Sequence, residues 1–332
     1  MRIFKEHIFV IYSVLLAVLI LVVGIAAKIF IPVEIPRDGS VIVHIDKGQS
    51  LISISHELEK EQIIDSPFLF RLIITLRGSE NSIPAGYYLF SDDSGQSGRS
   101  RYSLSAIARR LAQGEMGFRP QKITIPEGLN VIDIGNKVHQ EFPAIDALEF
   151  ASSAKPYEGY LFPDTYLFMP YATSGEIIHK MRDTFEQKVT DNPLFAEAIA
   201  SSTHSFADII KMASILEGEV RTLEDRKIVS DLLWRRIKKG MPLQVDSTFK
   251  YINQKTSAQL TLGDLKIDSL YNTYKYKGLP PTPISNPGLE TLFAAAEPTP
   301  NQYVFFLNDK DGISHFAKTF AEHIRYKNQY LK

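Results

Sequence analysis

One acidic side chain lies within the apolar face of a predicted helix. The segment from Phe206 to Glu219 follows Ser205, a common helix-capping residue type, and its apolar residues recur with helical spacing. Glu217 falls within the same arc, where an ionised carboxylate is costly unless it stays protonated or meets a special environment. A carboxyl protonated at neutral pH can act as a general acid, so Glu217 is the candidate catalytic residue. The spacing also fits a partly exposed residue at a helix end that frays at Gly218.

Three further stretches combine aromatic, acidic and amide side chains with turn-forming glycines and prolines. They cover residues 158–166, 243–248 and 271–288. Aromatic rings with polar tips suit stacking on sugars, and prolines reduce the ordering entropy lost on binding. Each stretch alone also fits a loop packed on the core, but three of them together with Glu217 favour a cleft that binds a polymer. The candidate substrate-binding residues are Glu158, Tyr160, Asp164, Tyr166, Gln244, Asp246, Tyr271, Asn272 and Tyr274.

Other kinds of chemistry have little support in the sequence. The chain has no cysteine, which excludes disulfides, thiolate metal sites and a cysteine nucleophile. Its 8 histidines are scattered and the sequence has no His-Glu-x-x-His motif, so we expect no metal and no cofactor. The Gly-x-Ser-x-Gly turn of many esterases and phosphate-binding glycine loops are also absent. The net charge is −1, with no basic stripe along a predicted helix, so no nucleic acid is expected as a partner.

The N-terminus predicts a membrane anchor over residues 8–28. Ile8 to Ala27 is an uncharged and almost wholly apolar run, about 30 Å long as a helix, which matches one bilayer core. A cleaved signal peptide is the alternative, because Gly24 to Ala26 resembles a cleavage site, but signal peptides have shorter apolar regions. We therefore expect a cytoplasmic leader of residues 1–7, a single pass through the inner membrane, and the remaining chain on the periplasmic or extracytoplasmic side.

Two soluble units are expected after the anchor. A chain of 332 residues with 44% hydrophobic residues can bury more than one core. Residues 39–118 follow a βααβ pattern, and Lys47-Gly48-Gln49-Ser50-Leu51 with Ile54 resembles the LysM family, whose small modules bind the N-acetylated sugar backbone of cell walls. Residues 119–332 mix helices, short strands and proline-rich loops. The predicted fold class is α+β: a transmembrane helix, a LysM-like subdomain and a mixed α+β catalytic domain.

Several motifs in register resemble the YceG-like family of endolytic murein transglycosylases. They are Glu158-Gly-Tyr-Leu-Phe-Pro-Asp164, Ala213-Ser-Ile-Leu-Glu217, Leu243-Gln-Val-Asp246, and Tyr271-Asn-Thr-Tyr274 with Gly278-Leu-Pro-Pro281. The likeness covers nearly everything after the anchor, and implies that residues 119–332 form a YceG-like catalytic domain. It also implies a membrane-anchored enzyme that cuts peptidoglycan strands internally, between N-acetylmuramic acid and N-acetylglucosamine. Glu217 lies at the position of the family's catalytic glutamate.

The resemblance implies lytic cleavage, which one carboxyl group can perform. Glu217 would protonate the glycosidic oxygen and then accept the proton of the muramyl 6-hydroxyl, which closes to a 1,6-anhydro product. The residues alone leave a hydrolytic muramidase open, because Glu158, Asp164 or Asp246 could supply the second carboxylate that hydrolysis requires. A non-catalytic scaffold that binds the cell wall is also open. The implied partners are peptidoglycan strands and the membrane, with peptidoglycan synthases as further candidates.

Overall fold

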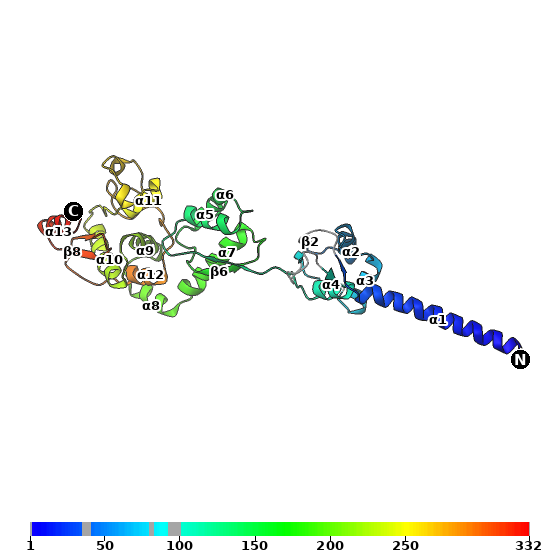
Figure 1. The fold of residues 1–332 in the computed structure, drawn as a ribbon. Helices are drawn as coiled ribbons and strands as arrows, with labels where there is room; N and C mark the ends of the chain where they lie inside the picture. The colour runs from blue at the N-terminus through cyan, green and yellow to red at the C-terminus, as the bar shows by residue number, and fades with distance from the viewer. Residues whose placement is uncertain (1, 35–40, 80–82, 92–100, 332) are drawn as a thin grey trace. The chain divides into compact units, whose positions relative to one another are not determined.

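The structure, a computed structural model, describes residues 2–34, 41–79, 83–91 and 101–331 (Figure 1). Contacts between residues divide the chain into two compact units, one ending at Arg119 and the other beginning at Pro120. The strands of the described part form antiparallel pairs, and helices supply most of the remaining regular structure. This mixture confirms the predicted α+β class.

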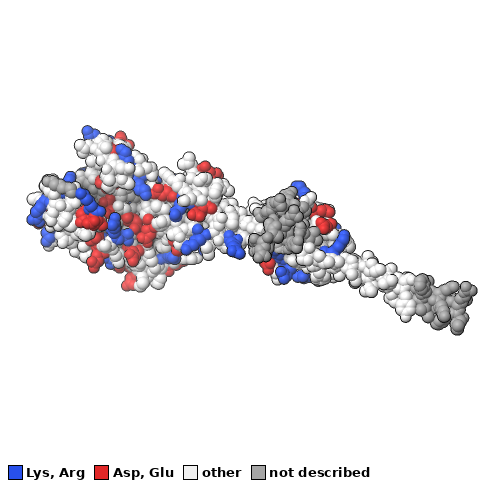
Figure 2. Space-filling model, viewed as in Figure 1, with Lys and Arg blue, Asp and Glu red and all other residues white. Residues whose placement is uncertain are grey.

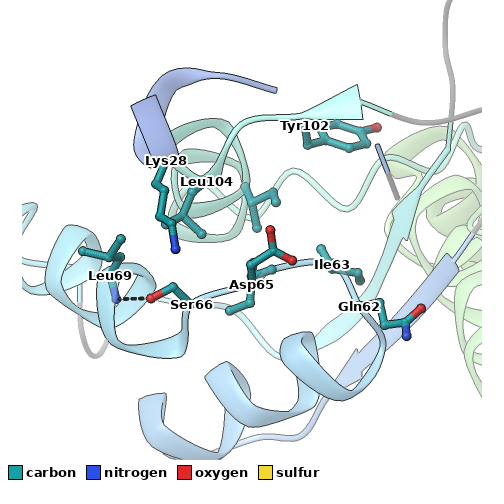
Figure 3. Close-up of a pocket in the computed structure, with 10 residues that line it drawn as sticks. Lys28, Gln62, Ile63, Asp65, Ser66, Leu69, Tyr102 and Leu104 are labelled. Atoms are coloured by element: carbon teal, nitrogen blue, oxygen red, sulfur yellow. Dashed lines mark hydrogen bonds between the residues drawn. The ribbon is translucent and has the colours of Figure 1, made fainter. Parts of the chain in front are cut away.

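The first unit begins with the long apolar helix α1 (Arg2–Phe30). Its segment Ile11–Phe30 is long and apolar enough to cross a membrane, and none of it is buried inside the protein. This is consistent with the predicted membrane anchor. Where α1 meets the folded part, a pocket of about 510 Å³ is lined by Lys28, Asp65 and Leu69, among others (Figure 3). None of the predicted site residues lies there.

The rest of the first unit is a small βααβ arrangement followed by a helix. Its elements are β1 (Val33–Glu34), β2 (Val41–Ile45), α2 (Leu51–Lys60), α3 (Pro67–Leu76), β3 (Gly86–Phe90), β4 (Arg101–Tyr102) and α4 (Leu104–Ala112). Strand β2 pairs antiparallel with β3, and β1 with β4. Ser50 and Ser66 cap α2 and α3 by accepting hydrogen bonds from backbone N–H groups. The βααβ order agrees with the sequence pattern, and a LysM-like role for this unit stays a prediction.

The second unit carries all the predicted site residues. Its elements are β5 (Gln121–Thr124), α5 (Val131–Glu141), α6 (Ala147–Ala154), η1 (Lys155–Tyr157), β6 (Thr165–Phe168), α7 (Ser174–Phe185), η2 (Glu186–Thr190), α8 (Pro193–Ser201), α9 (Phe206–Glu219), α10 (Leu223–Lys238), α11 (Ser247–Asn253), η3 (Ser257–Gln259), η4 (Asp264–Lys266), α12 (Leu289–Ala296), β7 (Phe305–Asn308), β8 (Ser314–Ala317) and α13 (Phe320–Tyr330). On the face shown in Figure 2, acidic and basic side chains are interspersed over this unit.

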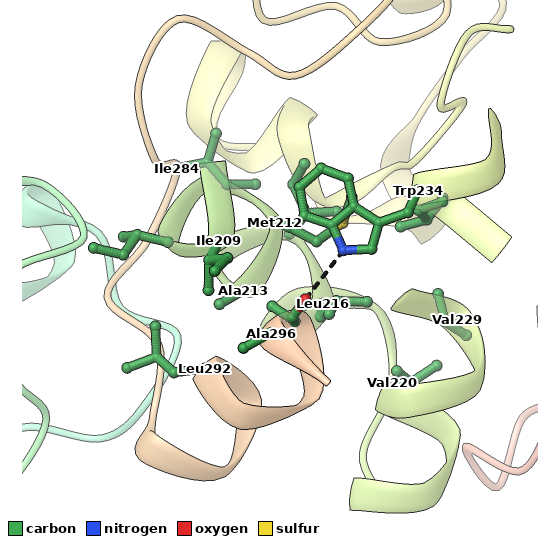
Figure 4. Packing of buried hydrophobic residues seen from close by; sticks show 14 of the residues in the cluster. Ile209, Met212, Ala213, Leu216, Val220, Val229, Trp234, Ile284, Leu292 and Ala296 are labelled. Carbon is green, nitrogen blue, oxygen red and sulfur yellow. Dashed lines mark hydrogen bonds between the residues drawn. The ribbon is translucent and has the colours of Figure 1, made fainter. Parts of the chain in front are cut away.

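Helix α9 lies at the centre of the larger of two hydrophobic cores in this unit. Seven residues of α9 between Ile209 and Leu216 are buried. Helices α10 and α12 pack against α9 (Figure 4). Trp234 of α10 donates a hydrogen bond of 3.0 Å from its ring nitrogen to the Ala295 carbonyl of α12. The second core lies between the β5–β6 pair and α5, α6 and α7. Because α9 is held on several sides, the residues at its C-terminal end have fixed positions.

Candidate active site

Glu217 lies in the last turn of α9, and its side chain is only 5% exposed. The helix begins where the sequence predicts, with Ser205 as its cap, and the apolar arc is buried. The apolar spacing therefore identified a carboxylate that is buried at the end of a core helix. The helix does not fray at Gly218, because α9 continues through it to Glu219, and Glu217 lies in the last turn with intermediate exposure as a whole residue.

The surroundings of the Glu217 carboxylate are polar. Arg226 Nη2 donates to Oε1 at 2.6 Å, and the backbone N–H of Gly288 and the hydroxyl of Thr291 donate to Oε2 at 2.9 Å and 2.6 Å. Arg226 is itself buried and also donates from Nε to the Val220 carbonyl at 3.2 Å. The ends of α9, α10 and α12 thus meet at one carboxylate, and the N-terminus of α12 adds a partial positive charge. The apolar face of the helix predicted an apolar environment for Glu217, but its carboxylate is surrounded by three hydrogen-bond donors, one of which is a cation.

A second carboxylate, Glu127, lies beside this group and was missed by the sequence reasoning. A Cβ atom built on Gly288 would lie 1.9 Å from Glu127 Oε1, so the carboxylate fills the space that the glycine leaves. Burial raises the pKa of Glu127, the negative charges of Glu217 and Glu290 raise it further, and the positive charge of Arg226 lowers it. The available signal was the turn Pro126-Glu127-Gly128, which fixes an acid directly after an alternating strand.

An open pocket lies next to these two carboxylates. It has about 570 Å³ of empty space, open solvent included, and Gly128 and Gly218 are in its wall beside Asp246 and Lys250. A Cβ atom on Gly128 would lie 3.2 Å from Glu217 Cγ, which shows how closely the wall approaches the buried acid. A second hollow, of about 640 Å³, runs along α5 and shares Lys250 with the first. Both hollows have charged side chains in their walls, among them Asp246 in the first and Asp133 in the second.

Among the predicted cleft residues, Asp246 lines the pocket next to Glu217. Tyr274 lies behind it and donates from its hydroxyl to Asp246 Oδ1 at 2.6 Å. Burial and the Asp246 carboxylate raise the pKa of Tyr274, so the phenol keeps its proton and remains a donor. Tyr271 is half-buried and exchanges a hydrogen bond of 2.8 Å with the Thr282 hydroxyl. Gln244 is exposed, in a left-handed backbone conformation with φ 53°.

Four predicted residues lie in the protein interior instead of in the pocket wall. Tyr160 packs against Phe185 with ring centroids 5.3 Å apart. Tyr166 is 4% exposed and donates to the Phe162 carbonyl at 2.6 Å. Asn272 is fully buried and donates to two backbone carbonyls. The hydroxyl of Tyr166 and the side-chain amide of Asn272 donate to backbone carbonyls, so these groups do not face the pocket. Tyr166 and Asn272 are therefore buried away from the predicted cleft, and Tyr160 is half-buried against the core.

Glu158, the fourth interior residue, is 3% exposed and has only protein partners. Its Oε2 accepts from the backbone N–H of Val131 at 3.3 Å, and its Oε1 accepts from the side-chain amide of Asn286 at 3.0 Å. Burial raises the pKa of Glu158 to about 7. Asp164 lies elsewhere, partly exposed, with Lys188 Nζ at 2.6 Å from Oδ2, and this contact lowers its pKa. Neither carboxylate lines the pocket next to Glu217.

Asn286 connects the segments that surround the site. Its side-chain oxygen accepts from the backbone N–H groups of Gly159 and Leu161, both at 2.9 Å. Its side-chain nitrogen donates to the Leu129 carbonyl and to Glu158, both at 3.0 Å. Its backbone carbonyl accepts from the Gly128 N–H at 2.9 Å. One buried amide therefore holds the turn before α5, the 158–161 loop and the segment leading to α12 in register.

Another buried carboxylate, Glu219, lies two residues beyond Glu217 and is the last residue of α9. Its Oε1 accepts from the backbone N–H of Ser247 at 2.9 Å, which links α9 to the start of α11. Burial raises the pKa of Glu219 to about 6. Across the described residues, no cluster of three or more histidine, aspartate or glutamate side chains could hold a metal ion.

Comparisons with known proteins agree on one family. A model of the YceG-like family matches residues 43–329. The endolytic murein transglycosylase of Bacillus subtilis (strain 168) is 31% identical over 326 residues, which cover 90% of this chain and 87% of that protein. The endolytic murein transglycosylase of Streptococcus pneumoniae (strain R6) is 24% identical over 89% of this chain, and the match spans 59% of the pneumococcal protein.

A solved structure shows the same fold. The crystal structure of a yceG-like protein from Listeria monocytogenes, at 2.6 Å resolution, superposes with a TM-score of 0.56 and 28% sequence identity. The match covers 88% of this chain and 100% of the Listeria chain. Since the family match extends over most of the chain and a relative above 30% identity is covered nearly throughout, the chain belongs to the YceG-like family.

Proposed function

We propose that this protein is an endolytic lytic transglycosylase, which cleaves the β-1,4 bond between N-acetylmuramic acid and N-acetylglucosamine within peptidoglycan strands. The observation that carries the proposal is the buried carboxylate of Glu217 beside an open pocket, in a chain whose relatives are named endolytic murein transglycosylases. The substrate is a polymer of sugars, which suits two hollows that share Lys250 and have polar side chains in their walls.

Glu217 would serve as acid and then as base. In its protonated form it donates to the glycosidic oxygen, and the C1–O4 bond of the muramyl residue breaks. The carboxylate left behind then accepts the proton of the C6 hydroxyl, whose oxygen forms the C1–O6 bond of the 1,6-anhydro end. The proton lost in the first step is regained in the second, and no water is consumed.

The hydrogen bonds to Glu217 support this sequence of steps. Arg226, the Gly288 N–H and the Thr291 hydroxyl all stabilise the carboxylate that forms when the proton leaves. They therefore favour proton release to the leaving oxygen, and they hold the carboxylate in one position for the second step. Asp246, fixed by Tyr274, is the predicted cleft residue best placed to contact a sugar hydroxyl.

The location follows from the anchor. With α1 in the inner membrane, the second unit would act on the periplasmic or extracytoplasmic side, where peptidoglycan strands are made and remodelled. An endo-acting enzyme held there would meet strands close to the synthases that polymerise them. Binding to such a synthase is part of this proposal.

Substitution of the acid tests the proposal. Full-length Glu217→Gln protein in detergent should release anhydro-terminated fragments from purified glycan strands roughly a thousandfold more slowly than the unmodified protein. Glu224→Gln is the matched control, because Glu224 is an exposed acid in the first turn of α10. Mass spectrometry of the products provides the measurement. Continued release of anhydro ends by the Glu217→Gln variant would reject the role of this residue.

A hydrolytic muramidase is the second candidate, and the nearness of Glu127 to Glu217 is the observation that favours it. Two carboxylates in one site can activate water as well as protonate the leaving oxygen. Hydrolysis would give a reducing-end product that is heavier by one water than the anhydro product. If neither product is formed by the unmodified protein, the molecule is a scaffold that binds the wall without cutting it.

A further inference from the structure

Glu127 and Glu217 approach the same glycine from two sides. The Gly288 N–H donates to Glu217 Oε2 at 2.9 Å, while Glu127 Oε1 occupies the space next to the Gly288 Cα. The path from Glu217 Oε2 through the N and Cα atoms of Gly288 and the built Cβ position to Glu127 Oε1 is about 8 Å long, so these two oxygens lie no farther apart than that. The residues come from segments far apart in the sequence, so their proximity is a product of the fold.

The position of Glu127 is set by the backbone. No hydrogen bond or ion pair to its carboxylate occurs within the described part of the chain. The next residue, Gly128, has φ +77° and donates its N–H to the Asn286 carbonyl, which fixes the turn. Glu127 is exposed as a whole residue, but its carboxylate end lies against Gly288 and is partly buried there, and Gly128 lines the pocket. A carboxylate held by its turn, with no partner of its own, acts on its neighbours through its charge.

The effect of the negative charge of Glu127 depends on the other charges around Glu217. Arg226 lies 2.6 Å from Glu217 and balances its negative charge. Glu127 adds a second negative charge from the turn before α5, and Glu290, in the first turn of α12, acts on Glu127 with the same sign. Glu217, Glu127 and Arg226 together carry a net charge of −1, so uptake of a single proton makes these three groups neutral. A like charge nearby favours the protonated form of a carboxyl group.

We propose that Glu127 is a positioning residue. Its negative charge offsets the positive charge of Arg226, so that Glu217 binds the proton that it later donates to the glycosidic oxygen. The inference rests on the proposed function, since it concerns the acid form of Glu217. Burial and, after it, the negative charge of Glu217 raise the pKa of Glu127, which agrees with two carboxylates that lie close enough to interact. In this arrangement Arg226 stabilises the product of proton release, and Glu127 keeps the proton available beforehand.

The test is the pH dependence of kcat/KM for Glu127→Gln in the full-length protein. A general acid must be protonated, so activity falls on the alkaline side of the profile. Removal of the Glu127 charge should move this alkaline limb about one pH unit to lower pH, so that activity falls more at alkaline than at acidic pH, with KM little changed. Glu290→Gln, at an exposed acid on α12, is the control and should shift the limb less.

Gly288→Ala is a second variant that does not alter any charge. Gly288 has φ −75°, which alanine adopts without strain, and its N–H can still donate to Glu217. The new methyl group would displace the flexible end of Glu127. We expect a shift in the same direction as for Glu127→Gln, but smaller.

Two outcomes would overturn the inference: an unchanged alkaline limb in both variants, or an equal loss of activity at every pH. The second would make Glu127 a group that contacts the substrate or supports the fold. Failure of the proposed function is separate, because it would appear as full activity in Glu217→Gln or as no product from the unmodified protein.

Discussion

Arg226 Nη2 lies 2.6 Å from Glu217 Oε1, and this ion pair joins the first turn of α10 to the last turn of α9. Both side chains are almost fully buried, at 10% and 5% exposure. Pairs of this kind compensate a large desolvation penalty, so the loss of one partner costs more than the pair contributes in total. The pair therefore connects the stability of the second unit to the chemistry proposed for it.

Arg226→Met should destabilise the second unit by about 3 kcal/mol, because Glu217 is left as a buried charge without its cation. The double variant Arg226→Met with Glu217→Gln should lose less than the sum of the two single changes, since the unpaired charge is then absent. Urea unfolding followed by fluorescence measures this, because Trp234 is the single tryptophan and lies in the core beside α12. Additive losses would show that the two side chains do not depend on each other.

Stability of the second unit should fall as the pH rises from about 4.5 to about 7, because of Glu158. Its pKa is raised from 4.5 to about 7 by burial, so the folded state binds a proton that the unfolded state releases. The contribution is complete below the unfolded pKa and is lost as the pH passes the folded pKa, with a change of about 3 kcal/mol at most.

Glu158→Gln should make the stability of the second unit less dependent on pH. Midpoints of urea unfolding, measured by tryptophan fluorescence between pH 5 and 8, would show this. Part of the slope should remain, because burial also raises the pKa of Glu219, to about 6, with the same sign. An unchanged slope in the variant would mean that Glu158 does not take up the proton.

Asn286→Ala should destabilise the second unit by about 3 kcal/mol or more. The change leaves the buried N–H groups of Gly159 and Leu161 without their acceptor, and buried unpaired groups are costly. Activity should fall as well, because the same segment positions the Gly288 N–H. Asn192→Ala is a suitable control, since Asn192 caps α8 and otherwise donates only an exposed hydrogen bond to the Lys188 carbonyl, so the variant should lose about 1 kcal/mol. A loss no larger than the control would contradict a connecting role for Asn286.

The central helix of the site could be predicted because the residues that determine it are close together in the sequence. Ser205 and the periodic apolar residues of 206–219 are enough to place a helix and to bury its face, and Glu217 with it. The partners of Glu217 could not be predicted in this way. Arg226 follows nine positions later across a helix boundary, and Gly288 and Thr291 meet the acid only after the chain has folded around α9.

The aromatic and acidic stretches show a second limit. Their composition indicated a special role, but composition does not determine which way a side chain points. Tyr166 and Glu158 turn inward because backbone N–H and C=O groups of neighbouring loops need partners there. Glu127, by contrast, was missed because a single acid in a short turn carries no periodicity, and its importance depends on where Gly288 comes to lie.

The segment from Ile284 to Gly288 is buried along its whole length, and it contains both Asn286 and the N–H that binds Glu217. The groups that would perform the cleavage are thus built into the same framework that keeps the unit folded. Damage to this segment should therefore reach the chemistry and the fold together.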